Sequence, residues 1–125
     1  MMHKVTAFLR SQGRNAWLFY GHLEVYVRRS SRQVPPKHVV VSTFDVANVS
    51  STIPGNGVFT RWLDELLPLL TASGFDVVRI ENVQTDRFAD YFRKRGWAET
   101  NSDTAPCFTK QLKDRRVHDS IQTGT

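Results

Sequence analysis

The stretch from His38 to Ile80 constrains the fold most, because it combines a long apolar strand, a turn, a helix and a second strand. Residues 38–49 carry apolar side chains on both faces of a predicted strand, which is typical of the centre of a sheet. A turn rich in glycine, serine and proline follows at residues 50–57. The next apolar side chains recur at spacings of three and four, which predicts an amphipathic helix. They are Phe59, Trp62, Leu63, Leu66, Leu67 and Leu70.

The segment after this helix decides the fold class. Residues 75–80 are a β-rich run directly after Gly74, which we expect to end the helix. Pro68 lacks a backbone donor, so we expect it to kink or shorten the helix near its last turn. A strand, a helix and a second strand in this order predict a crossover to a parallel neighbour. The chain is therefore predicted to be an α/β domain with a mixed sheet.

Strands are expected before this unit as well. Residues 17–20 are compact and aromatic, and residues 23–28 alternate apolar and polar side chains, so both predict strands. Residues 29–36 are polar and end in adjacent prolines, which cannot donate to a sheet, so we expect a connection. Residues 4–14 combine a short apolar stretch with turn formers, and we expect a short strand or an irregular arm there.

After the crossover unit, the sequence predicts one more helix and one more strand. Thr85 or Asp86 can cap a helix over residues 87–95, which carries an apolar stripe. A polar loop is expected over residues 99–106, and a final strand over residues 107–112. Together these patterns predict a mostly antiparallel sheet flanked by two main helices.

Length and composition limit the class of protein. With 125 residues and a hydrophobic fraction of 40%, the chain has the size of one globular domain with a real core. We expect this domain over residues 1–112 and a polar tail over residues 113–125. No run approaches the roughly 18 apolar residues of a membrane span, and no signal peptide is evident, so we expect a cytoplasmic protein. A single cysteine, Cys107, excludes a disulfide within the chain and a zinc site of paired cysteines.

The excess of basic residues suggests an anionic partner. Lys and Arg number 17 against 12 Asp and Glu, which gives a formal net charge of +5. Nucleic acid, a phosphorylated cofactor or an acidic protein face would suit this charge, and general solubility explains it equally well. The basic side chains gather in three clusters, namely Arg28-Arg29-Arg32-Lys37, Arg93-Lys94-Arg95 and Lys110-Lys113-Arg115-Arg116.

The turn between the central strand and the first predicted helix is the best candidate for a binding site. A strand that leads through glycines into a helix presents backbone N–H groups and the positive helix end to a phosphate. Gly55 and Gly57 lie at this junction, where a residue without a Cβ permits close approach and positive φ angles. The pattern is neither a Walker loop nor the three-glycine dinucleotide motif, and an ordinary strand-to-helix loop would also explain it.

From about Leu23 to Leu112, the order of elements and this loop resemble the GNAT superfamily of N-acetyltransferases, especially its compact members from bacteriophages. In that family a long strand ends in a valine, here Val49, and the following loop holds the pyrophosphate of coenzyme A with its amides. The resemblance implies a single-domain GNAT-like fold with a truncated N-terminal region, and acetyl-CoA as the cofactor. It places the cofactor loop at Pro54, Gly55, Asn56, Gly57, Val58, Phe59 and Thr60.

A later signature of the family is matched in outline near the second predicted helix. Thr85 stands where an asparagine usually contacts the pantetheine arm, and Gly96-Trp97 stands where the family has a Gly-Phe pair. Phe92 stands where many members carry the tyrosine that protonates the departing thiolate, and a phenyl ring cannot donate that proton. Tyr91 is the neighbouring candidate for this acid, although it lies about 100° around a helix from Phe92.

The resemblance implies an acetyl-CoA-dependent N-acetyltransferase that acts on a protein or small amine by direct transfer in a ternary complex. A base must then accept a proton from the acceptor ammonium. Glu24 and Asp45 are the candidate carboxylates, and His22 and His38 titrate in the useful pH range. For each of them, an ordinary position in or beside a strand is the alternative.

Three residues in the matched motifs favour a second hypothesis. Pro54 stands where the family usually has arginine or glutamine, Phe59 where it has a small residue, and Phe92 where it has the tyrosine. This degenerate cofactor motif suits a catalytically inactive effector of phage type, which would bind a host protein through its basic surface in the host cytoplasm. Nucleic acid is the less favoured partner. A homodimer that completes the acceptor side is compatible with both hypotheses.

Overall fold

The computed structural model describes residues 2–34, 39–51, 57–83, 85–100 and 105–112. The elements of this part of the chain are, in order, α1 (His3–Arg10), β1 (Asn15–Tyr20), β2 (Leu23–Val34), β3 (Val39–Ser51), α2 (Val58–Ala72), β4 (Val77–Ile80), α3 (Asp86–Lys94), β5 (Ala98–Thr100) and β6 (Cys107–Gln111). None of the described helices is long and apolar enough to cross a membrane.

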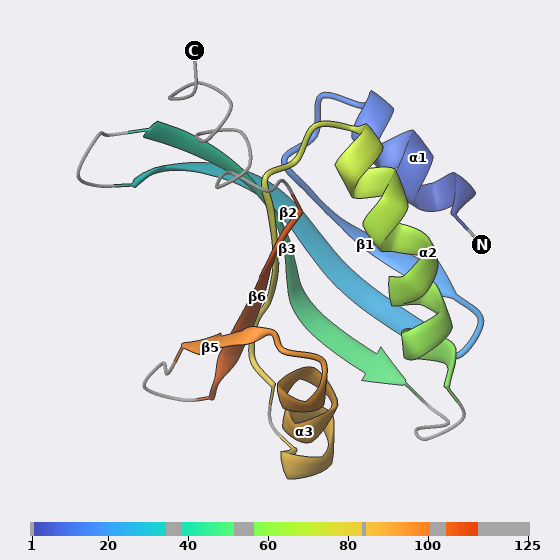
Figure 1. The fold of residues 1–125 in the computed structure, drawn as a ribbon. Helices are drawn as coiled ribbons and strands as arrows, with labels where there is room; N and C mark the ends of the chain where they lie inside the picture. Colours follow the sequence, from blue (N-terminus) through green and yellow to red (C-terminus); the bar gives the residue numbers. More distant parts are fainter. Residues whose placement is uncertain (1, 35–38, 52–56, 84, 101–104, 113–125) are drawn as a thin grey trace.

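The strands form one six-stranded sheet in the order β1-β2-β3-β4-β6-β5 (Figure 1). Every neighbouring pair is antiparallel except β3 and β4, which are parallel and joined through α2. Parallel neighbours need such a crossover, because a tight hairpin can only reverse the chain. The predicted α/β class, with its mixed and mostly antiparallel sheet, is confirmed.

The helices pack on one face of the sheet, which we call the helix-covered face. Side chains of directly paired residues point to the same face, so the strand registers assign each side chain to one face or the other. Large buried apolar side chains of β1, β2, β3, β4 and β6 lie on the helix-covered face, among them Leu18, Val25, Val46, Ile80 and Phe108. Each helix contacts this face through an aromatic pair: Phe8–Phe44 (6.2 Å between centroids), Tyr20–Trp62 (6.1 Å) and Phe92–Phe108 (5.1 Å).

The opposite face of the sheet, which we call the helix-free face, carries no helix in the described part of the chain. Its side chains alternate with those of the core along each strand. They include Trp17, Phe19, Glu24, Tyr26, Arg28, Asp45, Arg79 and Cys107. The beginning of β3 is also exposed rather than covered from two sides as predicted, since Val39 and Val40 are 39% and 58% exposed.

The N-terminal segment corrects one prediction. Residues 3–10 form α1, not a strand or an irregular arm. Val5 and Phe8 lie on one side of this helix and are both buried against the core. Burial of that side outweighs the weak helix propensity of the β-branched residues Val5 and Thr6. The sheet is therefore flanked by α1 in addition to the two predicted helices.

Two predicted connections contain strand. β2 continues to Val34, so residues 29–34 pair with β3 and do not form a loop. β5 pairs with β6 at the edge of the sheet and includes residues 99–100, which were predicted as loop. Both segments are polar. Their structure comes from backbone pairing with a neighbouring strand, which a hydrophobic pattern does not report.

The two predicted glycine stops are confirmed, because α2 and α3 end in the same type of motif. Gly74 and Gly96 follow these helices with φ angles of 91° and 78°. The closing bonds form Schellman motifs. They run from the N–H of Phe75 to the carbonyl of Leu70 and from the N–H of Trp97 to the carbonyl of Phe92, both at 3.1 Å. Pro68 lies inside α2 without ending it, and the helix continues to Ala72.

Candidate cofactor site

β3 and β4 separate in the middle of the sheet, and this split forms the core of the candidate site. Their pairing covers only residues 43–46 of β3 and 77–80 of β4. One further backbone bond runs from the N–H of Glu81 to the carbonyl of Val46 (2.9 Å). β3 then continues without a β4 partner, whereas Asn82 adopts a left-handed φ of 61° beyond the end of β4. Among the described residues, the second half of β3 therefore has no paired strand on the β4 side, and we call this side its free edge.

A β-bulge lies beside this free edge. The register of β2 and β3 shifts between Tyr26 and Val27, so that Ala47 has no residue opposite it. Such bulges bend a strand and often occur next to active sites. Beyond the bulge, the predicted cofactor contact Val49 is half-buried and points to the helix-covered face, where α2 begins.

The start of α2 provides room and backbone donors for an anion. Gly57 is the N-cap, with a φ of 80°, and a Cβ at this position would meet nothing within 4 Å. The first helical bond runs from the N–H of Arg61 to the carbonyl of Gly57 (3.0 Å). The amides of Phe59 and Thr60 precede this bond and so have no acceptor within the helix. No acidic side chain occupies the first turn.

The described part of the predicted loop thus fits the pyrophosphate end of coenzyme A. Pro54, Gly55 and Asn56 lie outside the described residues, so the structure does not test them. Val58 and Phe59 are half-buried at the start of α2. Their backbone lies at the positive end of the helix dipole, which favours phosphate.

Phe59 and Phe92 belong to an aromatic cluster between α2 and α3. Phe92 is fully buried, as expected for a core side chain and not for one that lines an open site. Phe59 lies 5.1 Å from Phe88 and 6.5 Å from Phe92, measured between ring centroids. Its ring therefore joins the first turn of α2 to α3. Trp62 and Trp97 are also buried beside this cluster, so both belong to the core.

Of the two candidate carboxylates, Asp45 is buried and committed to partners. Its side chain is 1% exposed, and its Oδ2 accepts hydrogen bonds from Arg28 Nε (3.2 Å) and Ser30 Oγ (3.0 Å). Arg28 also donates to the carboxylate of Glu81 at 2.5 Å. Burial disfavours the charged guanidinium, but the carboxylates of Glu81 and Asp45 outweigh this effect and raise the pKa of Arg28.

Glu24, the other candidate, is exposed. It lies in β2 directly opposite Ser50, in the part of β3 that has the free edge. Within the described ranges, its carboxylate makes no ion pair and no hydrogen bond. Glu24 is therefore open to solvent, whereas Asp45 is buried and holds Arg28.

The remaining predicted site residues lie on α3. The ring of Tyr91 is half-buried and packs under the guanidinium of Arg95, which lies 3.7 Å from its centroid. The hydroxyl oxygen of Thr85 accepts a hydrogen bond from the N–H of Phe88 (3.2 Å) and so caps the helix as predicted. The structure does not bring Tyr91 together with the candidate bases.

Cys107, His22 and His38 are three further side chains of chemically reactive types. Cys107 is buried, with its sulfur 3.8 Å from Arg79 Nη2. His22 lies in the exposed turn between β1 and β2, and His38 lies outside the described residues. No group of three metal-binding side chains occurs in the part of the chain that the structure describes.

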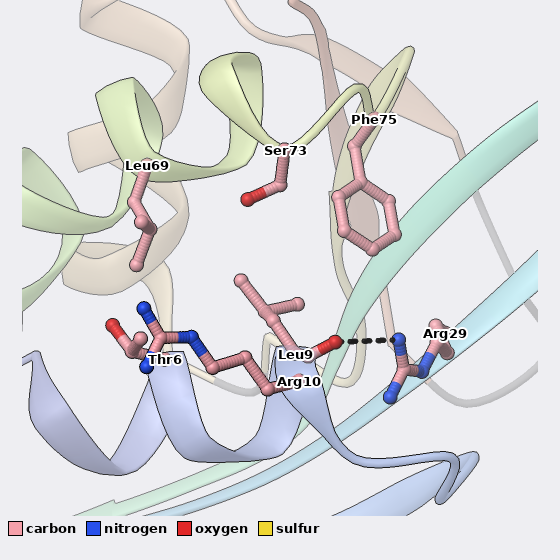
Figure 2. Close-up of a pocket in the computed structure, with 7 residues that line it drawn as sticks. All are labelled: Thr6, Leu9, Arg10, Arg29, Leu69, Ser73 and Phe75. Atoms are coloured by element: carbon pink, nitrogen blue, oxygen red, sulfur yellow. Dashed lines mark hydrogen bonds between the residues drawn. The ribbon is translucent and has the colours of Figure 1, made fainter.

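A pocket lies at the opposite end of α2 from Gly57, between this helix and α1 (Figure 2). Its volume is about 330 Å³. Leu9 of α1 faces Leu69 of α2 across it, and Phe75 closes one side. Arg29 borders the pocket and donates from Nη1 to the carbonyl of Leu9 (3.3 Å). This pocket could not be predicted from the sequence, because it depends on α1, where a strand or an irregular arm was expected.

No protein family model and no curated protein sequence matches the chain. Solved structures match it by fold. A chain of the KacTA–DNA complex superposes with a TM-score of 0.55 at 7% identity, covering 98% of this chain and 86% of that one. A tyrosine-to-phenylalanine variant of the AtaT toxin, bound to the C-terminus of the antitoxin AtaR and acetyl-CoA, gives a TM-score of 0.55 at 6% identity and 82% coverage of this chain. AtaT complexed with acetyl-methionyl-tRNAfMet gives 0.51 at 9% identity and 78% coverage.

At such low identities these likenesses establish the fold alone, which is the GNAT fold of these toxins. The chain spans 64% and 66% of the two AtaT chains, just under two thirds of their length. The matched AtaT structure contains acetyl-CoA. The expected bacteriophage origin and the degenerate cofactor motif stay predictions, because none of the matched structures bears on them.

Proposed function

We propose that the protein is an acetyl-CoA-dependent N-acetyltransferase that transfers the acetyl group directly to an amine. The observation that carries this proposal is the split between β3 and β4, which leaves a free strand edge beside the bulge at Ala47 and near the open start of α2. The bound acetyl-CoA in the AtaT structure of the same fold supports the proposal.

The residues that would hold the cofactor come from the two sides of the split. The amides of Phe59 and Thr60, with Gly57 and Val58, would bind the pyrophosphate, and Val49 would contact the pantetheine arm. Pro54, Gly55 and Asn56 would complete the loop, and Thr85 would lie on the α3 side, whereas the fully buried Phe92 would support the site from the core without touching the cofactor. When bound, acetyl-CoA would supply an acetyl group activated as a thioester to the amine nitrogen, with release of the thiol.

Glu24 is the base in this proposal. It is exposed and lies opposite the free part of β3, so it can take a proton from the acceptor ammonium. Asp45 instead stabilises Arg28, which fastens Glu81 at the point where β4 leaves β3. Solvent would protonate the departing thiolate in this proposal, because Phe92 has no proton to donate and the ring of Tyr91 is half-buried against Arg95.

Calorimetric titration with acetyl-CoA and coenzyme A tests the proposal. We expect micromolar binding to the wild type and at least a tenfold weaker affinity for Gly57→Arg, because the added side chain fills the open start of α2. Thr71→Arg adds the same charge at the exposed far end of α2 and should bind normally. Thermal melting of both variants shows whether they are folded. No binding to the folded wild type at millimolar ligand would overturn the proposal.

We propose one alternative, a GNAT-fold module that binds a protein partner without catalysis. The packing of Phe59 between α2 and α3 favours it, as does the buried Phe92 in place of the family tyrosine. The AtaT toxin, which shares the fold, is bound to the C-terminus of its antitoxin. Failure of the folded wild type to bind acetyl-CoA would favour this alternative.

A further inference from the structure

The helix-free face carries a group of aromatic side chains at its β1 edge. Trp17 and Phe19 in β1 are each 48% exposed, although large apolar side chains usually lie inside. Tyr26 in β2 is paired with Trp17, and their ring centroids lie 5.0 Å apart. The strand register places all of these rings on the same face, which the described helices leave open.

Glu24 lies in the middle of this aromatic group. It is paired with Phe19 across the strands and is two residues from Tyr26 on the same strand and face. Opposite residues in antiparallel strands have Cβ atoms roughly 5 Å apart, and diagonal neighbours such as Trp17 are roughly 7–8 Å apart. One small group can therefore touch the carboxylate and an aromatic ring at the same time.

The chemistry of this arrangement selects a cation. A carboxylate attracts a positive charge by Coulomb's law, and the face of an aromatic ring attracts it through the ring quadrupole. A phosphate would be repelled by Glu24, so these side chains do not suit a nucleic-acid backbone. The next cation along β2 on this face, Arg28, is held by Asp45 and Glu81 and does not supply the missing positive charge.

We propose that Trp17, Phe19, Tyr26 and Glu24 form the binding site for the acceptor, and that the acceptor is a primary alkylammonium group such as a lysine side chain. The rings hold the ammonium by cation–π contact, and Glu24 pairs with it beside the free edge of β3. This inference rests on the proposed function, in which Glu24 takes the proton of the same ammonium.

Tryptophan fluorescence in the absence of cofactor tests the binding step directly. The probe is a short peptide with blocked ends and one lysine, and the matched control is the same peptide with an acetylated lysine side chain. Trp17 is exposed whereas Trp62 and Trp97 are buried, so a change in emission reports on Trp17. We expect saturable binding of the lysine peptide and at least tenfold weaker binding of the control.

Variants of the site sharpen this test. Glu24→Gln and Tyr26→Leu should each weaken binding of the lysine peptide at least fivefold, because one removes the charge and the other a ring. For a calorimetric version of the titration, Trp17→Phe should retain most of the affinity and Trp17→Leu should lose it. Val40→Leu changes an exposed apolar side chain far from Glu24 and should bind like the wild type. Equal binding of both peptides, or none to the folded wild type, would overturn the inference.

The outcomes separate this inference from the proposed function. A protein that binds acetyl-CoA but not the lysine peptide retains the transferase proposal and loses this acceptor site. A protein that binds the lysine peptide but not acetyl-CoA retains the ammonium site and loses the transferase proposal. Quenching of Trp17 by single-stranded oligouridylate that weakens steeply with salt would assign the face to nucleic acid and overturn the inference.

Discussion

Arg28 and Arg29 are neighbours in β2, but their side chains lie on opposite faces of the sheet because successive side chains of a strand alternate. The two arginines therefore bind different parts of the molecule. Arg29 lies on the helix-covered face and holds α1. Its guanidinium donates to the carbonyls of Phe8 (2.8 Å), Leu9 (3.3 Å), Ser11 (2.6 Å) and Gly13 (2.8 Å), and it lies 4.9 Å from the centre of the Phe8 ring. Arg28 lies on the helix-free face and pairs with Asp45 and Glu81.

This difference shows why a run of basic residues in a sequence is not a basic surface. Arg29 satisfies backbone carbonyls at the C-terminal end of α1, where the helix dipole favours a cation. Arg28 neutralises two carboxylates. Both guanidinium groups are bound by groups of the protein itself and are not available to bind a phosphate. Two of the four members of the first predicted basic cluster therefore stabilise the fold. The faces of the sheet, rather than the order of residues, decide what each charge does.

Substitutions at Leu18 and Trp17, which are neighbours in β1, should show the largest difference in stability between the two faces. Leu18 is 7% exposed and Trp17 is 48% exposed. Leu18→Ala should lower the free energy of unfolding by about 3 kcal/mol, because it leaves a cavity in the core. Trp17→Ala should lower it by less than about 1 kcal/mol. Urea denaturation measures both, and equal losses would contradict the assignment of the faces.

Removal of the Arg29 guanidinium, which binds the C-terminal end of α1, should have the next largest effect on the free energy of unfolding. Arg29→Met keeps an apolar stem but leaves the carbonyls at the end of α1 without their charged donor. We expect the free energy of unfolding to fall by about 2–3 kcal/mol, since hydrogen bonds to a charged group contribute more than neutral ones.

A second arginine provides the control for this variant. Arg87 is exposed on α3, so Arg87→Met removes a charge without removing contacts to the end of a helix. It should change the free energy of unfolding by less than about 0.5 kcal/mol. Hydrogen exchange of the amides in α1 should rise in Arg29→Met but not in the control. A stable α1 in Arg29→Met would show that Val5 and Phe8 hold the helix without help.

Removal of the Arg28 guanidinium should lower the free energy of unfolding somewhat less than removal of the Arg29 guanidinium. Arg28→Met leaves Asp45 buried with only Ser30 as a partner, which destabilises a folded protein because the charge has lost its compensation. The side chain of Arg28 is 38% exposed, so we expect a loss of about 2 kcal/mol and not the full value for a buried pair.

A double-mutant cycle with Asp45→Asn isolates this pair. If the ion pair matters, the double variant Arg28→Met/Asp45→Asn loses less stability than the sum of the single variants. Additive losses, measured by denaturation in urea, would mean that Asp45 is stabilised mainly by Ser30 and by packing.

Elements whose apolar residues recur at a regular spacing could be predicted from the sequence. The stripe from Phe59 to Leu70 predicted α2, and the glycines that end α2 and α3 were identified correctly because a positive φ favours glycine. α1 was missed because it is short and contains Val5 and Thr6, so only its packing against the sheet makes it a helix. β5 was missed because its side chains are all exposed.

The candidate site was predictable to a smaller extent. The junction of β3 and α2 and the carboxylates Glu24 and Asp45 could be named from the sequence, but their different environments could not. The split of β3 from β4 and the bulge at Ala47 arise from strand register, which depends on pairing between distant segments. The aromatic group around Glu24 became visible only when the register placed Trp17, Phe19 and Tyr26 on one face.

Arg93 should contribute the least to stability of the three arginines, because its ion pair with Glu99 is exposed. Arg93 donates to Glu99 from Nε (2.8 Å) and Nη2 (2.9 Å), and this hydrogen bonding lowers the pKa of Glu99. A lowered folded-state pKa adds stability above the unfolded value of about 4.3, and the gain is lost as the pH falls through the folded value. We therefore expect Glu99→Gln to be slightly less stable than the wild type at pH 7, and this difference to shrink as the pH falls below about 4.3. Urea midpoints of both proteins across this range measure the difference, which should be the smallest of the set because solvent and salt screen exposed charges. A difference as large as that of Arg28→Met would mean that burial is not what separates the strong arginine contacts from the weak ones.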